Sequence, residues 1–95
     1  MALGGLPNTG TKSNVSGSAS STTILAANTG RLGAVIFNDS TAVLYLDLTG
    51  GTASSSSYSV QLGAGSYFEV PHGYLGLITG IWASATGAAR VTEFS

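Results

Sequence analysis

From Thr22 onward the chain consists of short apolar runs separated by turn-forming residues, and this pattern constrains the fold most strongly. No run has the i, i+3, i+4, i+7 spacing of an amphipathic helix. The runs recur at about the 8–12-residue spacing that is typical of all-β sandwiches and barrels. The separators, such as Asn28-Thr29-Gly30 and Pro71-His72-Gly73, carry turn chemistry.

We therefore expect an all-β domain over residues 22–95, a small antiparallel β-sandwich or jelly-roll-like barrel of about seven or eight strands. The predicted strands are residues 22–27, 32–38, 42–48, 58–62, 67–70, 75–84 and 90–94. In the strand at 58–62, strict alternation places Tyr58, Val60 and Leu62 on one face.

The predicted strand at 42–48 is apolar on both faces. One face carries three leucines, and the other carries Val43, Tyr45 and Asp47. Such a strand is central in a sheet, or its second face lies against a neighbouring subunit. Val43 and Tyr45 are therefore candidates for an oligomer interface or for the core.

The longest apolar run, residues 75–84, is interrupted by Gly76 and Gly80. Glycine inside a strand commonly marks a bulge or a close approach of another group. Trp82 lies two residues after Gly80 on the same face, so it is a candidate either for the core or for an oligomer interface, where tryptophan is enriched.

Charged residues make up only 7% of the chain, against roughly 25% in an ordinary domain. The net charge is −1, and only three residues are Lys or Arg. This number is too small to neutralise the phosphates of a nucleic-acid site, so we expect no nucleic-acid partner. A surface with so little charge suits a subunit inside an assembly.

Small size also favours association. A chain of 95 residues without cysteine buries a modest core and has no disulfide to support it, so oligomerisation or docking is the expected source of stability. No apolar stretch approaches the length of a membrane span, and the first residues do not resemble a signal peptide. We expect no membrane partner and assembly in a cytoplasm.

Residues 1–21 are rich in Gly, Ser, Asn and Thr and show no periodicity. Because this composition offers little apolar surface to bury, the segment is predicted to be a flexible N-terminal arm, dispensable for folding, that becomes ordered against a partner. Leu3, Leu6 and Pro7 are its candidate contact residues.

No catalytic, cofactor or metal site is predicted. The single histidine, His72, lies in a Pro-His-Gly turn, and no G-x-S-x-G sequence is present. The carboxylates are scattered singly, which does not suit zinc. Glu69 and Glu93 form a conceivable glycosidase pair, but so small a domain offers little room for a cleft. We expect a protein that is not an enzyme.

Three segments resemble small structural proteins encoded among the virion genes of tailed bacteriophages. They are AVIFNDSTAVLYLDL (34–48), SYSVQLGAGSYFEVP (57–71) and GIWASATGAARVTE (80–93). The resemblance implies a capsid decoration (cement) protein or a related head accessory protein. Its partner would be the major capsid protein, its favoured form a homotrimer and its location the surface of the phage head. A head–tail connector or tail component, and a glycan-binding module using Tyr45, Tyr58, Tyr67 and Trp82, remain the alternatives.

Overall fold

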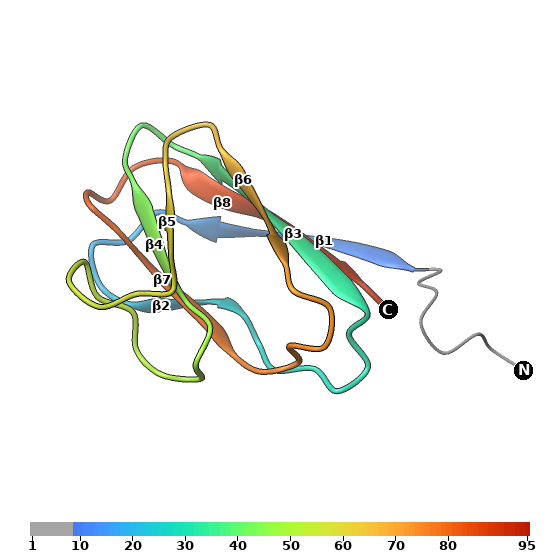
Figure 1. Cartoon of the computed structure of the whole chain (residues 1–95). Coiled ribbons are helices and arrows are strands. Elements are labelled where there is room, and N and C mark those ends of the chain that lie inside the picture. Colours follow the sequence, from blue (N-terminus) through green and yellow to red (C-terminus); the bar gives the residue numbers. More distant parts are fainter. Residues whose placement is uncertain (1–8) are drawn as a thin grey trace, which may run out of the picture.

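The computed structural model describes residues 9–95, which form eight strands in two antiparallel sheets (Figure 1). The strands are β1 (Gly10–Ser16), β2 (Thr22–Leu25), β3 (Gly33–Asp39), β4 (Leu44–Asp47), β5 (Val60–Leu62), β6 (Tyr67–Val70), β7 (Ile78–Trp82) and β8 (Ala88–Phe94). One sheet has the order β1-β8-β3-β6 and the other β2-β7-β4-β5. The two sheets pack as a small β-sandwich, which confirms the predicted class. In the described part of the chain they do not close into a barrel, and no helix is present.

Inward-facing side chains from both sheets form one core. From β3 and β8 come Ile36 and Val91, and from β4 and β7 come leucine, isoleucine and tryptophan side chains. The largest fully buried side chains are Trp82, Ile36, Leu44, Leu46, Ile78, Val91 and Asn38. Trp82 is 2% exposed and therefore belongs to the core of a single chain.

Gly80 allows this core to close. A Cβ atom there would lie 2.8 Å from Ile24 Cγ1 and 3.0 Å from Leu44 Cδ1. The close approach expected from a glycine inside this run is therefore present. It brings β2 and β4 against β7, the strand between them.

Strand β7 is shorter than the predicted strand at 75–84 and begins only at Ile78. The reason lies in the backbone before it, where the carbonyl oxygens of Tyr74 and Gly76 accept hydrogen bonds from the Arg31 side chain. Those carbonyls are occupied by a guanidinium group, and the chain there is an ordered loop outside the sheet ladder.

The expected N-terminal arm differs from the structure over Gly10–Ser16. This segment is β1, which pairs antiparallel with β8 along its whole length. The strand is an edge strand whose side chains are exposed except for the half-buried Val15, so it lacks the apolar alternation that reveals a strand in a sequence. Leu3, Leu6 and Pro7, the candidate contacts of the arm, lie outside the described residues.

Tyr58 also departs from the prediction that it shares a face with Val60 and Leu62. Strand β5 begins at Val60, so the two-residue alternation does not extend back to Tyr58. The Tyr58 ring lies against Tyr45, and its hydroxyl donates to Gln61 Oε1 at 3.1 Å. Tyr58 therefore lies on the outer side of the sheet.

Candidate interaction surface

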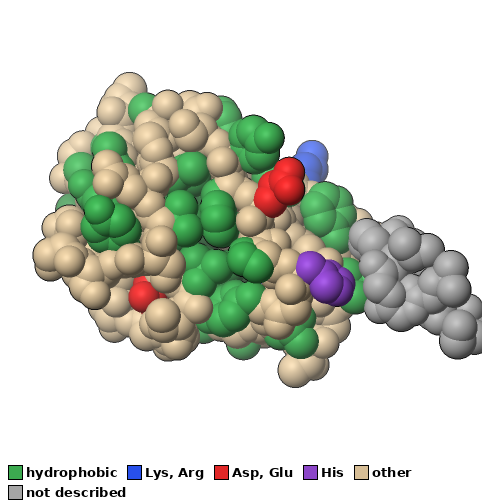
Figure 2. Space-filling view, in the orientation of Figure 1, with side chains coloured by type: hydrophobic (Ala, Val, Ile, Leu, Met, Phe, Trp, Pro, Cys, Tyr) green, Lys and Arg blue, Asp and Glu red, His purple; other side chains and the backbone are tan. Residues whose placement is uncertain are grey.

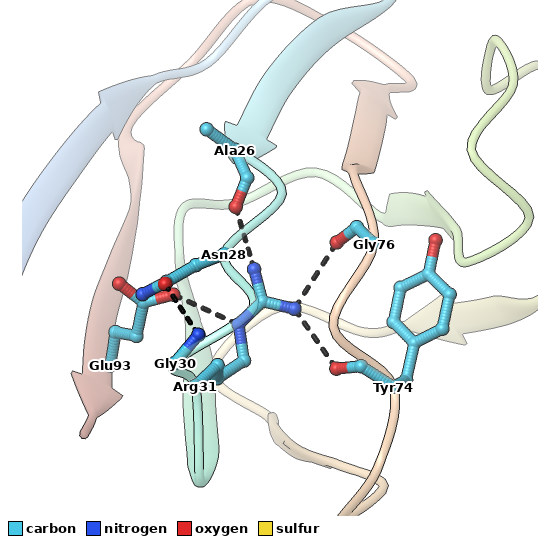
Figure 3. Close-up of polar contacts among 7 residues, drawn as sticks. All are labelled: Ala26, Asn28, Gly30, Arg31, Tyr74, Gly76 and Glu93. Atoms are coloured by element: carbon cyan, nitrogen blue, oxygen red, sulfur yellow. Dashed lines mark hydrogen bonds and ion pairs between the residues drawn. The ribbon is translucent and has the colours of Figure 1, made fainter.

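Two of the few charges lie inside the fold. Arg31 is 3% exposed and its Nε donates to Glu93 Oε2 at 2.8 Å. Figure 3 shows the guanidinium group enclosed by backbone carbonyls, since it also donates to those of Ala26, Tyr74 and Gly76. The ion pair therefore joins two loops to β8, and of its two side chains only that of Glu93, which is 19% exposed, reaches the surface.

Asn38 forms a second buried polar network, at the other end of β3. Its Nδ2 donates to the carbonyls of Ala42, Leu62 and Gly63. Its Oδ1 accepts the indole N–H of Trp82 at 3.2 Å. One side chain therefore links both sheets and the turn after β5. Sequence analysis placed Asn38 at the end of the predicted strand 32–38 and did not identify this role, which depends on contacts with residues distant in the sequence.

Four charged side chains remain on the outer face of the β1-β8-β3-β6 sheet or at its rim. They are Lys12, Asp39, Glu69 and Arg90. Arg90 donates to Asp39 Oδ2 at 3.0 Å and to Asn14 Oδ1 at 3.1 Å, and both partners are exposed. This face is consequently polar and solvated, although Tyr67 and Phe37 are also exposed on it.

The outer face of the other sheet, β2-β7-β4-β5, has a different character. We define the Tyr45 face as Val43, Tyr45, Tyr58, Gln61 and Ile81. Tyr45 lies opposite Ile81 on β7 and Gln61 on β5, and the Tyr45 and Tyr58 ring centroids are 4.9 Å apart. All five side chains are partly or fully exposed, and none carries a charge.

Within residues 9–95, the only charged residue near the Tyr45 face is Asp47 at the end of β4. It is 7% exposed, and its Oδ2 accepts hydrogen bonds from the backbone of Thr49 and Gly51 and from the Thr49 hydroxyl. The carboxylate thus orders the following turn. Figure 2, a view over β5 and β6, the edge strands of the two sheets, shows hydrophobic side chains near the middle of this side of the molecule and few charged groups.

The structure brings together two of the three residues predicted for an interface or core. Val43 and Tyr45 lie on the Tyr45 face, half-buried, whereas Trp82 points to the opposite side of the sheet. Sequence analysis did not single out Ile81, which strand alternation places on the face opposite Trp82 and which the register between β4 and β7 places beside Tyr45.

The groups considered for catalysis are not brought together. Glu93 points inward to Arg31, whereas Glu69 is exposed on the outer side of the same sheet. His72 is exposed, and its Nδ1 lies 3.0 Å from the Leu32 carbonyl oxygen. Residues 9–95 contain no pocket and no group of three or more His, Asp or Glu side chains placed to hold a metal ion. No helix that could span a membrane occurs in this part of the chain.

Comparisons with family models, with curated proteins and with solved structures found no match to this chain.

Proposed function

We propose that this protein is a non-enzymatic structural protein of a tailed-phage virion. It decorates and stabilises the capsid by binding the outer surface of the head lattice as an oligomer, for which a trimer is favoured. Its partner is the major capsid protein, and it joins the particle in the host cytoplasm. The proposal combines the resemblance of residues 34–93 with the surface that the fold presents.

The Tyr45 face is the observation that supports this proposal most. Interface centres are depleted of charged side chains and enriched in tyrosine, and the Tyr45 face has both properties. Burying it removes apolar area from water at no cost of desolvating a charge. A small sandwich with one uncharged and one charged outer face suits a protein that covers another surface with the first and meets water with the second.

The test begins with virions that carry the protein and from which it has been stripped. Variants are added back to the stripped particles, and electron cryomicroscopy measures how many of the lattice sites each variant occupies. Ile81→Lys places a charge at the centre of the Tyr45 face. Val35→Lys is its matched control, because Val35 is also half-buried and also lies on a central strand, on the outer face of the other sheet. Ile81→Lys should abolish lattice-wide occupancy and Val35→Lys should retain it. Equal occupancy of both variants would exclude the Tyr45 face as the attachment surface.

The same images distinguish the alternatives. Density at a single vertex would support a head–tail connector or tail component, and density at a fibre tip would support the glycan-binding module. The glycan alternative has less support from the side chains, because Trp82 is buried and Tyr45 and Tyr58 pack against each other. Tyr67, which is 63% exposed, is the one remaining ring of that set with a largely open surface.

A further inference from the structure

Strand β1 is an open sheet edge that differs from the other edges of the sandwich. Edge strands pair readily with other chains unless they are short, bulged, charged or interrupted by proline. β5 has three residues, β2 has four with a register shift after Thr23, and β6 has four with Glu69 inside and Pro71 directly after. β1 carries one charge, Lys12, as β6 does, but it has seven residues, no bulge and no proline in or directly after it.

The pairing with β8 shows which backbone groups of β1 point to the open side. Thr9 and Ser95 exchange both of their backbone hydrogen bonds, and Gly17 N–H donates to Gly87. In an antiparallel ladder such pairs alternate with pairs that make no mutual bonds. The N–H and C=O groups of the even-numbered residues Gly10, Lys12, Asn14 and Ser16 therefore point away from β8. Among residues 9–95, no strand pairs with them.

The sequence of β1 fits a second copy of itself. If two β1 strands pair antiparallel about a two-fold axis at Ser13, Gly10 faces Ser16 and Lys12 faces Asn14 of the other copy. All even-numbered residues then face even-numbered residues, so every outward backbone group of the strand finds a partner. Val15, the half-buried residue of β1, faces Thr11 on the core side of the extended sheet.

Neighbouring registers are less favourable. An axis at Lys12 places the two ammonium groups directly opposite each other, which destabilises a cross-strand pair. An axis at Asn14 leaves Gly10 and Thr11 beyond the end of the partner strand. We propose that two copies of this chain associate through β1 with the axis at Ser13, which joins their β1-β8-β3-β6 sheets into one continuous sheet.

This contact does not rest on the proposed function, since it follows from the strand edge alone. It also leaves the Tyr45 face free, because that face belongs to the other sheet. A particle could therefore use both contacts, the Tyr45 face for attachment and β1 to link neighbouring copies by a two-fold axis.

The absence of cysteine from the sequence allows a direct test by cross-linking. In the proposed register, the two Ser13 Cα atoms lie about 4.5 Å apart as a pair without mutual hydrogen bonds, a distance that permits a disulfide. Two copies of Ser16 lie roughly 20 Å apart at about 3.4 Å per residue. Under oxidised glutathione, Ser13→Cys should form a disulfide-linked dimer in high yield, while the equally exposed Ser16→Cys should remain monomeric on a denaturing gel.

A second pair of variants blocks the edge in the Ser13→Cys background. Lys12→Pro removes an N–H that points away from β8 and places a ring in the path of the partner strand. Lys12→Gln removes the same charge and keeps the N–H. The proline variant should reduce dimer yield at least about tenfold, and the glutamine variant should not reduce it. The proposal is overturned if Ser13→Cys and Ser16→Cys cross-link to the same extent, if neither does, or if both Lys12 variants behave alike.

Discussion

At the scale of single residues, two polar side chains, Arg31 and Asn38, are buried inside the fold, and most of the other charged side chains lie on the outer face of the β1-β8-β3-β6 sheet. Arg31 lies just before β3 and Asn38 near its end, and each donates hydrogen bonds to several backbone carbonyls of the adjoining strands and loops. Within the described residues, every buried side-chain nitrogen and oxygen has a hydrogen-bond partner. These two side chains therefore hold the ends of a small sandwich that has no disulfide.

Arg31→Gln should destabilise the protein by about 2–4 kcal/mol, because it removes the buried guanidinium group that pairs with the partly exposed Glu93 and donates to three backbone carbonyls. Urea unfolding followed by circular dichroism measures this loss. Arg90→Gln is the control, since it removes a similar ion pair whose side chains are half exposed and should cost less than about 1 kcal/mol. Equal costs for the two variants would show that the Arg31 pair does not hold the loops.

Asn38→Ala should cost about 1–3 kcal/mol, because it removes the donor to three backbone carbonyls and leaves the buried Trp82 indole N–H without its acceptor. Tryptophan fluorescence during thermal unfolding reports directly on this site, since the chain has one tryptophan. Asn14→Ala, at an exposed position, should leave the melting temperature nearly unchanged. A similar result for Asn38→Ala would contradict the role given to its network.

At the scale of elements, the pairing of β1 with β8 makes Gly10–Ser16 part of a sheet, where a flexible arm was expected. Ala89 and Val91 of β8 are 0% and 2% exposed, and β1 lies directly beside both. A polar segment can thus be a structural strand when it completes the hydrogen bonding of its neighbour and shields that neighbour from water.

Removing residues 1–16 should therefore destabilise the fold, in contrast to the behaviour of a dispensable arm. Loss of the β1–β8 ladder should lower the melting temperature by at least about 5 °C, which corresponds to roughly 1 kcal/mol at this size. Differential scanning calorimetry of the truncated and full chains gives the comparison. Identical transitions would mean that β1 contributes nothing to folding.

The elements that sequence analysis predicted well are those with apolar alternation. Residues 67–70 match β6 at both ends, and the doubly apolar run at 42–48 contains β4, a central strand of its sheet, which is one of the two positions predicted for it. The pattern failed where contacts distant in sequence decide the outcome. The segment at Gly10–Ser16 is a strand because it pairs with β8, and the Arg31 side chain is held by carbonyls more than 40 residues away. Tyr58 lies on the outer face for a local reason, because β5 begins only at Val60.

At the scale of the whole molecule, charged side chains are even rarer on the surface than in the sequence. The burial of Arg31 and the turn contacts of Asp47 leave the remaining charges on or beside one sheet. One outer face is therefore polar, and the other is uncharged and rich in tyrosine. This asymmetry is what a protein that adheres by one face requires.

With the β1 edge blocked by Lys12→Pro, the isolated protein should be a trimer. Multi-angle light scattering at micromolar concentration measures the mass, and Ile81→Lys added to the same chain should leave it unchanged, because the Tyr45 face is the surface that binds the capsid. A stable monomer would contradict trimer formation in solution, and a monomer only after Ile81→Lys would show that the Tyr45 face holds the subunits together instead.

The central claim, that the protein binds and stabilises a capsid through an uncharged face, is tested most directly by adding it back to stripped virions at low and at high salt. Apolar burial and backbone hydrogen bonds are screened little by salt, so occupancy should be nearly the same in both conditions. Decorated particles should also rupture at a higher temperature than stripped ones. Equal rupture temperatures for stripped and decorated particles would contradict the stabilising role, and loss of binding as salt rises would contradict attachment through the Tyr45 face.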